Sequence, residues 1–429
     1  MSTRIRRNLV CGLGRPAMAA LLAMAADARA SNGLNLVGFG AESLGLGSAD
    51  IAMSRDSNAV NINPAGLTQI AAQRFDGSLV PFYTFGYAHT DAFNDNDKID
   101  NPFGLFGNGA YARRAPHPDL VFGLGLFVSG GTGVTYETLQ TAFGTTDEYS
   151  AVLGITKIAT GIGWQVSEQL SLGAGLNLSY SQTRQKVFPD TSDADAGFFG
   201  LRLDGADGVS FNGRLGLQYR VTPELTLGAS WASETDIKLE GGTLTVNYED
   251  IGLGRVKYED AEVDGFALAQ ELGVGLAWQF HPRWLLAAEV TWLDWSGALG
   301  DARLRATRPR NGDAPAVVEI TQALDHRDQY VVGVGLAYDW DDKTVLRVGV
   351  NIADNPIPAQ TLTPVLNLTA DGELDLGLTR RFGKGWEFGT ALQYQPYKSV
   401  DYNNPQQPFG PSREDYGVVA LTLQLSRSW

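Results

Sequence analysis

The sequence predicts an all-β fold: a transmembrane antiparallel β-barrel of about 14 strands, with an N-terminal hatch of short helices and coil plugging its lumen. Three observations predict it. Apolar residues alternate with small or polar ones through most of the chain, as in strands whose two faces meet different surroundings. Glycine makes up 51 of 429 residues and accompanies 19 Phe, 15 Tyr and 9 Trp, which favours strands over helices. Short turns also alternate with long polar segments.

Residues 1–30 are predicted to be a signal peptide. Three arginines precede a small-residue-rich apolar segment at 9–26, and Ala-Arg-Ala at 28–30 matches a cleavage site. We therefore expect export, with a mature chain that starts at Ser31. The one cysteine, Cys11, is lost with the signal peptide, so the mature chain has no disulfide and no Cys-ligated metal, and no cofactor is expected.

Residues 31–72 are predicted to form the hatch, and residues 73–429 the barrel. The first segment does not alternate, is rich in Gly, Ala, Ser and Asn, and is too short for an independent domain. It enters before the first strand, so the barrel lumen is the simplest place for it. A plugged lumen predicts gated or selective passage rather than an open pore.

The C-terminal segment shows the alternation most clearly. One face carries Val419, Leu421, Leu423, Leu425 and Trp429, and the other carries Ala420, Thr422, Gln424, Ser426 and Ser428. A β-sandwich would also alternate, with its apolar face in a shared core. Aromatic residues at the ends of the apolar faces favour a membrane barrel instead, because rings gather at membrane interfaces; examples are Trp284, Trp292, Tyr338 and Trp340.

The connections support the same fold. Short turns are expected near 115–118, 167–168, 222–223, 281–282, 341–342 and 383–385. The long polar segments expected between them are 91–101, 137–147, 184–207, 240–264, 297–327, 353–371 and 398–413. Outer-membrane barrels have short periplasmic turns, long outer loops and an even number of strands. The sequence therefore predicts a multi-pass barrel in the outer membrane of a Gram-negative cell.

Two classes of function are disfavoured by the composition. With 33 basic against 48 acidic residues the chain lacks the basic face that nucleic-acid binding requires. Enzyme chemistry is also not expected, because the four histidines are scattered and no nucleophile or metal motif accompanies them. An outer-membrane lipase, a porin for polar solutes and an adhesin are the alternatives. The porin should show charged constriction residues on the lumen face, which this sequence predicts to be mainly Gly, Ala, Ser and Thr.

Several ordered motifs resemble the long-chain fatty acid transporter (FadL-like) family of outer-membrane proteins. The resemblance starts in the segments 38–40, 45–50 and 58–67 and centres on the hatch motif Asn63, Pro64, Ala65 and Gly66. It continues at 123–131, 294–296, 346–349 and 355–358. Taken only as a local signal, the hatch motif would be a turn in which proline fixes φ and asparagine caps.

The resemblance implies a 14-stranded barrel that passes hydrophobic compounds inward without energy input. In the family, a ligand is caught among the outer loops, moves to a pocket beside the hatch and leaves sideways through a gap made by a kink in the third strand. The corresponding lateral-gate kink here would be Ser129, Gly130 and Gly131, where many relatives have Pro-Phe-Gly. The cargo would be long-chain fatty acids or aromatic or aliphatic hydrocarbons, and the motifs do not choose between them.

Six apolar residues in expected loops are candidates for ligand capture: Phe93, Phe103, Leu105, Phe106, Phe198 and Phe199. Each could instead pack within its loop or touch lipid. The expected partners are a hydrophobic small molecule, outer-membrane lipid and lipopolysaccharide, and the barrel-assembly machinery, for which a terminal aromatic such as Trp429 is typical. The protein is expected to be a monomer.

Overall fold

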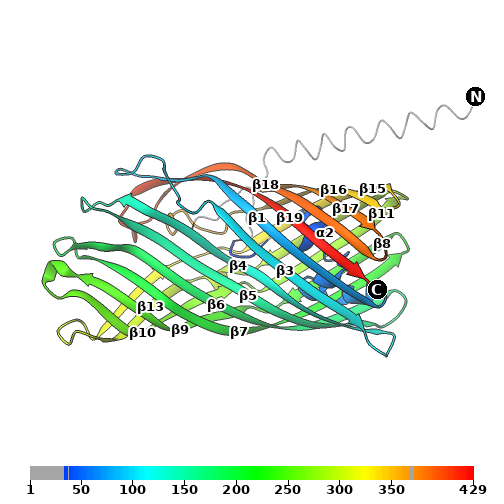
Figure 1. Ribbon diagram of the computed structural model, residues 1–429, viewed down its shortest axis with the longest axis horizontal. Coiled ribbons are helices and arrows are strands. Elements are labelled where there is room, and N and C mark those ends of the chain that lie inside the picture. Colours follow the sequence, from blue (N-terminus) through cyan, green and yellow to red (C-terminus); the bar gives the residue numbers. More distant parts are fainter. Residues whose placement is uncertain (1–32, 37, 367–371) are drawn as a thin grey trace, which may run out of the picture.

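The computed structural model describes residues 33–36, 38–366 and 372–429, which form a closed, antiparallel barrel of 14 strands (Figure 1). The predicted signal peptide and its cleavage site lie outside these residues, as does Ser31. The barrel closes where the first strand pairs with the last, from Arg74↔Ser428 to Thr90↔Arg413. No helix in the described ranges is long and apolar enough to cross a membrane.

The strands follow one another around the barrel. The first seven segments are β1 (Gln73–Thr90), β2 (Asp97–Lys98), β3 (Phe103–Arg114), β4 (Leu120–Gln140), β5 (Thr146–Gln165), β6 (Leu170–Asp193) and β7 (Phe198–Thr222). The next seven are β8 (Leu225–Ala232), β9 (Thr235–Tyr248), β10 (Gly254–Leu268), β11 (Glu271–His281), β12 (Trp284–Leu293), β13 (Asp301–Pro309) and β14 (Val317–Ala323). The last five are β15 (Gln329–Asp341), β16 (Thr344–Ala353), β17 (Glu373–Phe382), β18 (Trp386–Asn403) and β19 (Pro411–Ser428). The 19 segments make 14 strands, because five consecutive pairs each form one strand of the barrel: β2 with β3, β8 with β9, β10 with β11, β12 with β13, and β14 with β15.

Short helical segments lie inside the barrel and in the connections between strands. The hatch contains α2 (Gly40–Leu44), η2 (Ser57–Val60) and η3 (Pro64–Gln69), and Figure 1 shows α2 within the barrel near the end where the chain terminates. Two further pieces, η4 (Glu249–Ile251) and α3 (Trp295–Ala298), lie in connections between strands. We call the end of the barrel that carries the C-terminus the turn end and the opposite one the loop end.

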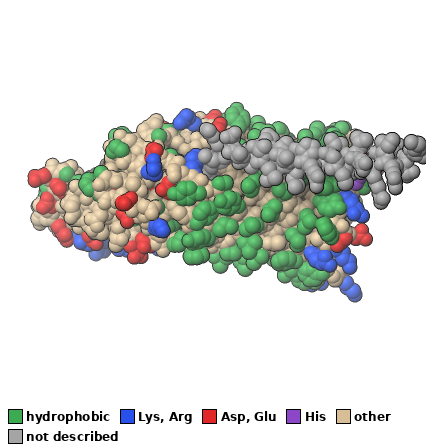
Figure 2. Space-filling model, turned by 90° about the horizontal axis from the view of Figure 1, so that it is seen from above, with side chains coloured by type: hydrophobic (Ala, Val, Ile, Leu, Met, Phe, Trp, Pro, Cys, Tyr) green, Lys and Arg blue, Asp and Glu red, His purple; other side chains and the backbone are tan. Residues whose placement is uncertain are grey.

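The predicted alternation is confirmed. On β19, Leu421 and Leu423 are 38% and 39% exposed on the outer surface, whereas Thr422 and Gln424 are buried toward the lumen. Figure 2 shows the outward apolar side chains gathered over one part of the barrel, with charged side chains toward both ends. An apolar belt between charged ends is the surface of a barrel that sits in a bilayer.

Three of the long loops expected from the sequence are wrong in part, because the chain there forms strands. Most of 184–207 and 240–264 is strand, because β6 runs to Asp193, β7 starts at Phe198, and only 249–253 separate β9 from β10. Likewise, 297–327 contains β13 and β14. In Figure 1, β9, β10 and β13 extend toward the loop end. There one face packs on a buried apolar cluster while the other carries charge, so these strands lack the apolar outward face that identified the others.

Candidate functional site

The hatch lies against a bed of lumen-facing glycines. A Cβ atom at Gly173 of β6 would overlap the backbone nitrogen of Ala65, and one at Gly216 of β7 would overlap Asn63 Oδ1. On the other side of the lumen, a Cβ at Gly349 of β16 would overlap the backbone of Gly47. The many glycines on the inner face therefore let the hatch backbone approach the barrel wall closely.

Asn63 joins the hatch to two barrel strands. Its side-chain amide donates hydrogen bonds to the carbonyl oxygens of Ile51 at 2.8 Å, Leu217 of β7 at 3.1 Å and Ala229 of β8 at 3.3 Å. Its Oδ1 accepts from the backbone N–H of Ala65 at 3.2 Å and caps η3. Asn63 is completely buried, so each of these bonds is shielded from water. Asparagine supplies both donor and acceptor here, as no aliphatic side chain could.

The rest of the hatch motif continues the same turn. Pro64 occupies the first turn of η3, where the N–H that proline lacks would have no helical partner. Ala65 and Gly66 are buried beside it, and a Cβ at Gly66 would overlap the carbonyl oxygen of Ser54. The motif is therefore both a capped turn and the contact between hatch and wall.

Charged residues on the lumen face also hold the hatch. Glu289 of β12 accepts hydrogen bonds from the backbone N–H groups of Asp50 at 2.9 Å and Ile51 at 2.8 Å. Asp76 of β1 accepts from the N–H and hydroxyl of Ser57 at 2.9 and 2.6 Å. The expectation of a lumen face with mainly Gly, Ala, Ser and Thr is thus wrong in part. Glu289 thus binds a segment more than 200 residues away in the sequence, which no local pattern could show.

One ion-pair cluster ties α2 to β16. Arg347 of β16 and Arg55 of the hatch each contact Glu42 Oε1 at 2.6 Å. Burial alone would raise the pKa of the Glu42 carboxyl, but the guanidinium groups of Arg55 and Arg347 outweigh it and hold that pKa well below its usual value. Glu42 therefore stays ionised at any physiological pH and keeps α2 on the wall.

The third barrel strand, β4, is bent at the predicted Ser129, Gly130 and Gly131. Its register with β5 shifts between Val128 and Gly130. Gly131 has a φ of +130°, a backbone conformation that residues other than glycine rarely adopt. A Cβ at Gly130 would overlap the carbonyl oxygen of Leu34. A bulge with two glycines thus re-aims the strand and admits a second segment of backbone.

The first described hatch residues pair with this bend. The N–H of Leu36 donates to the carbonyl of Ser129 at 3.3 Å, and the N–H of Gly131 donates to that of Leu34 at 3.2 Å. These bonds form a short antiparallel bridge centred on Asn35 and Gly130. We call residues 33–36 the inner strap.

Beside the bend, the barrel wall has a gap between β3 and β4. β3 pairs with β1 from Arg113 to Phe103, but its backbone pairs with β4 only between Arg114 and Gly109. Past that point one side-chain bond remains, from the N–H of Val128 to Asn108 Oδ1 at 2.9 Å.

Contact resumes toward the loop end. There Asn101 accepts from the N–H of Thr135 at 2.9 Å and donates to the carbonyl of Gly133 at 3.0 Å. Between this contact and Asn108, residues 102–107 have no backbone pairing with β4 in the described structure. The gap therefore has two asparagine side chains at its ends.

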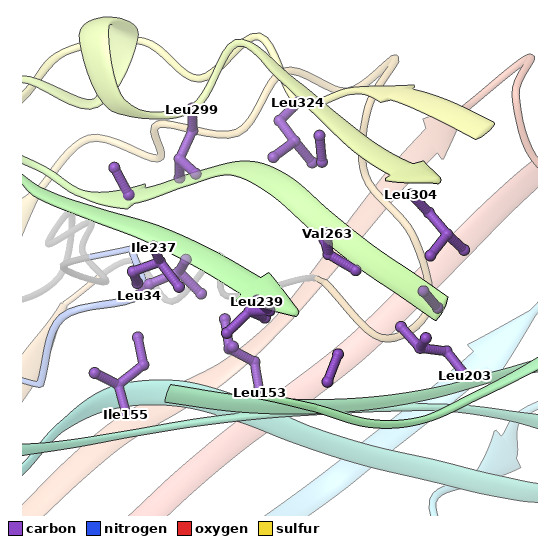
Figure 3. Close-up of a cluster of buried hydrophobic side chains, with 14 of the residues drawn as sticks. Leu34, Leu153, Ile155, Leu203, Ile237, Leu239, Val263, Leu299, Leu304 and Leu324 are labelled. Carbon is purple, nitrogen blue, oxygen red and sulfur yellow. The ribbon is translucent and has the colours of Figure 1, made fainter. Parts of the chain in front are cut away.

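Two apolar cavities lie along this wall. The outer one, about 570 Å³, is near the loop end and is lined by residues of the cluster in Figure 3, where Leu153, Leu203 and Val263 project from different strands toward a common centre. The inner one, about 380 Å³, lies behind the gap and is lined by the inner strap and by Val80, Phe82, Phe106 and Val134. Leu34 and Thr132 line both, so these two residues stand between the cavities.

Two capture candidates lie at the outer cavity. Phe198 and Phe199 begin β7 and line this cavity. The Phe198 ring stacks on Phe143 at 4.4 Å between centroids, and Phe199 packs edge-on against Tyr248 at 4.9 Å. They lie in a strand and not in a loop, but the structure brings them to the loop end, beside the cavity.

The other four candidates for ligand capture lie at different places in the barrel. Phe103, Leu105 and Phe106 lie on β3, so the loop expected for them is wrong. Phe103 and Leu105 are 76% and 67% exposed, on the outer face, and Phe106 lines the inner cavity. Phe103, although exposed, also borders this cavity at the gap. Phe93 follows β1 in a turn and is not among the residues that line either cavity.

The sequence reasoning missed Asn101, Asn108, Thr132 and Leu34. No local signal marks them, because their importance depends on which strands fail to pair. Acidic residues on the lumen face had a signal, since Glu373 and Asp375 alternate with leucines on β17.

The fold is that of solved outer-membrane channels. The toluene transporter TodX of Pseudomonas putida superposes with a TM-score of 0.74 at 21% identity, over 92% of this chain and 99% of that one. TbuX, the toluene transporter of Ralstonia pickettii, gives 0.73 at 21% over the same shares. A FadL homologue of Pseudomonas aeruginosa gives 0.70 at 15%, again over 92% and 99%. A comparison with curated protein sequences gave no match.

A family match covers almost the whole chain. Residues 21–420 match the family described as "Outer membrane protein transport protein (OMPP1/FadL/TodX)". The earlier resemblance to the FadL-like family is thereby confirmed, as is the location in the outer membrane. The chain belongs to the OMPP1/FadL/TodX family of outer-membrane transport proteins.

Proposed function

We propose that this barrel takes up hydrophobic compounds passively and releases them sideways, through the gap between β3 and β4, into the membrane. The observation that carries the proposal is the apolar inner cavity lying directly behind wall residues 102–107, whose backbone has no pairing with β4. A compound in that cavity reaches hydrocarbon without crossing a water-filled exit. The related structures named as toluene transporters, and CymD, a monoaromatic hydrocarbon channel, support a hydrophobic cargo.

The physical barrier is the polar outer leaflet, because a hydrophobic solute crosses the hydrocarbon itself readily. Burial of apolar surface, at about 25 cal/mol per Å², favours entry into the outer cavity. Phe198 and Phe199 provide aromatic surface there. The inner cavity and the gap then offer an apolar path past the headgroups.

The inner strap closes the passage between the two cavities. Leu34 and Thr132 separate the two cavities. Among the described residues, the strap is held by two backbone hydrogen bonds to β4 and by one from the Asn35 side-chain amide to Glu271 of β11 at 3.1 Å. Moving the strap away from Gly130 would join the cavities, whereas the hatch around Asn63 is fixed by several buried bonds. We infer that Asn63, Pro64, Ala65 and Gly66 form the anchor and Ser129, Gly130 and Gly131 the lateral gate.

An open porin for polar solutes is disfavoured, because the hatch occupies the lumen and contacts the charged lumen residues Glu289, Asp76 and Arg347. We infer a channel rather than an enzyme. A closed barrel has no free strand edge, which supports a monomer. Contacts with lipid, lipopolysaccharide and the barrel-assembly machinery follow from the location.

Thr132 offers the test, because it lines both cavities. A Thr132→Trp substitution should fill the passage, while Thr132→Val keeps the size of the side chain. In a strain that lacks other uptake channels, we expect the wild type and Thr132→Val to take up radiolabelled toluene at similar rates. Thr132→Trp should lower the protein-dependent rate at least about tenfold. Equal rates for both variants would contradict a route past Thr132.

A further inference from the structure

The inner cavity has a polar end, formed by β17 and β18. Glu373 of β17 lines the cavity there together with Gln393 and Gln395 of β18. The side-chain amides of Gln393 and Gln395 donate hydrogen bonds to Glu373 Oε2 at 3.4 and 3.3 Å. Glu373 is only 3% exposed, and its Oε1 has no hydrogen-bond partner. An unpartnered polar atom that is buried in the wall of a cavity is a place where a ligand atom can bind.

The charge state of Glu373 follows from its surroundings. Asp375 lies next to it on the same face of β17, is completely buried, and has no partner for either carboxyl oxygen. Among the described residues, no Lys, Arg or His lines the inner cavity. Two neighbouring carboxyl groups that are buried without a cation are held neutral, because each charge would lose its hydration and repel the other. Glu373 is therefore a carboxylic acid, which can donate a hydrogen bond as well as accept one.

The two amide donors indicate which oxygen carries the proton. Glu373 Oε2 accepts from both amides, so it acts as the carbonyl oxygen and the proton belongs on Oε1. Oε1–H is then a buried donor that lacks an acceptor. Within the described structure, the side-chain carbonyl oxygens of Gln393 and Gln395 accept no hydrogen bond. The same end of the cavity therefore offers both a donor and acceptors.

The opposite end of the inner cavity is apolar. Phe82 of β1, Phe106 of β3 and Val134 of β4 line it beside the gap. Around the barrel wall, β18, β19 and β1 separate β17 from β3. A ligand that places a polar group at Glu373 would therefore extend its hydrocarbon part toward the gap through which we propose that cargo leaves.

We propose that the Glu373 end of the inner cavity binds the hydroxyl group of a hydrophobic alcohol or phenol. The inference rests on the proposed function, because it names a chemical class of cargo for that route. A hydroxyl oxygen can accept from Glu373 Oε1–H while its own proton is donated to the carbonyl oxygen of Gln393 or Gln395. A methyl group at the same place would leave these atoms without partners. A site built to bind a hydroxyl group discriminates strongly against an analogue that lacks it.

The test compares 2-naphthol with 2-methylnaphthalene, which are similar in size and both uncharged at pH 7. Equilibrium dialysis measures their binding to the full-length protein in nanodiscs, and empty nanodiscs measure partition into lipid alone. Each affinity is expressed relative to the partition of that compound into lipid, because the hydroxyl group also favours water. We expect the wild type to bind 2-naphthol at least about tenfold more tightly on this scale, a difference of about 1.4 kcal/mol.

Variants of Glu373 assign the preference to hydrogen bonding. Glu373→Gln keeps a donor and an acceptor, so the preference should stay within about twofold of the wild type. Glu373→Leu keeps neither, so the preference should fall to about twofold or less. Glu319→Leu makes the same type of change on the exposed surface of β14 and should leave the preference unchanged. Folding of each variant is checked by heat-dependent migration in electrophoresis.

An infrared measurement tests the site without the leucine variant. In the wild type, 2-naphthol should shift an absorption band of a protonated carboxyl group, and 2-methylnaphthalene should not. The shift should be absent from Glu373→Gln, which has no carboxyl group at this position.

Equal affinities of the two compounds for the wild type, on the scale corrected for lipid, would overturn the inference and leave the proposed function intact. A preference that persists in Glu373→Leu, a preference that is lost in Glu373→Gln, or a carboxyl band that does not shift would overturn it equally. Failure of both compounds to bind above the level of empty nanodiscs would overturn the proposed function, and the inference with it.

Discussion

The backbone N–H of Gly131 donates a hydrogen bond to the carbonyl oxygen of Leu34 at 3.2 Å. This bond joins the bend of β4 to the inner strap, and on the proposed route it must break when cargo passes. The bend and the strap therefore act together. The bulge in β4 lies beside the gap in the wall, and its backbone also holds the inner strap that closes the passage between the two cavities.

Gly130→Val should displace the inner strap and open the passage between the two cavities. Its side chain would overlap the Leu34 carbonyl oxygen and push the strap from β4, which joins the two cavities. We expect protein-dependent toluene uptake to rise by at least about twofold. The matched control is Gly133→Ala on the same strand, where an added Cβ meets no atom within 4 Å. An uptake rate in Gly130→Val at or below that of the control would contradict the gating role of the strap.

Asn63→Ala should loosen the hatch and spare the barrel. The substitution removes the side-chain donor to the carbonyls of Leu217 and Ala229, and each lost hydrogen bond costs about 0.5–1.5 kcal/mol. We expect faster cleavage of the hatch by an added protease while heat-dependent electrophoretic migration still reports a folded barrel. Gln169→Ala, in an exposed turn between β5 and β6, should behave as the wild type. Unchanged hatch cleavage in Asn63→Ala would remove Asn63 from the anchor.

Glu289 should be needed as a hydrogen-bond acceptor for the hatch, more than for its charge. Glu289→Gln keeps one oxygen toward the N–H groups of Asp50 and Ile51, whereas Glu289→Leu leaves both without a partner. In planar bilayers we expect little open conductance from the wild type, a small increase from the glutamine variant and a large one from the leucine variant. Large, steady conductance from the intact protein would contradict a lumen closed by the hatch.

The attachment of α2 should resist acid. A carboxyl whose pKa is lowered on folding contributes stability above its unfolded pKa, near 4.5, and that stability is lost as pH falls toward the folded value. The contribution of Glu42 to the attachment of the hatch should therefore change little between pH 7 and about 5, so cleavage by an acid-active protease is compared at each pH with a variant that weakens this ion pair. In Arg347→Gln, the Glu42 pKa loses one of the two cations that lower it, so cleavage should begin at a higher pH than in the wild type. Identical pH profiles would show that the Arg347–Glu42 pair does not hold α2.

The sequence allowed the barrel and hatch to be predicted because both leave local patterns. The alternation around Leu421 and Thr422 depends only on neighbouring residues, and the Asn63 motif is itself a short turn. Gly130 and Gly131 could be located for a similar reason, since adjacent glycines in a strand indicate a bulge.

The route itself left no such pattern. The gap exists because Phe106 has a partner on β1 and none on β4, and strand pairing is a property of the whole sheet. The loops were predicted too long for a related reason. Beyond the membrane, a strand such as β10 faces water where others face lipid, so its polar residues resemble those of a loop.

The most direct test of a sideways exit is to trap cargo within it. A neutral, photoreactive aromatic diazirine is supplied to outer-membrane vesicles, activated, and located by mass spectrometry of the labelled peptides. We predict labels on Phe106 and Val134, which line the inner cavity, and on Phe199 of the outer cavity. In Thr132→Trp the outer label should persist and both inner labels should be lost. Labelling at Phe199 alone in the wild type, or inner labels that persist in Thr132→Trp, would contradict a route from the outer cavity to the gap.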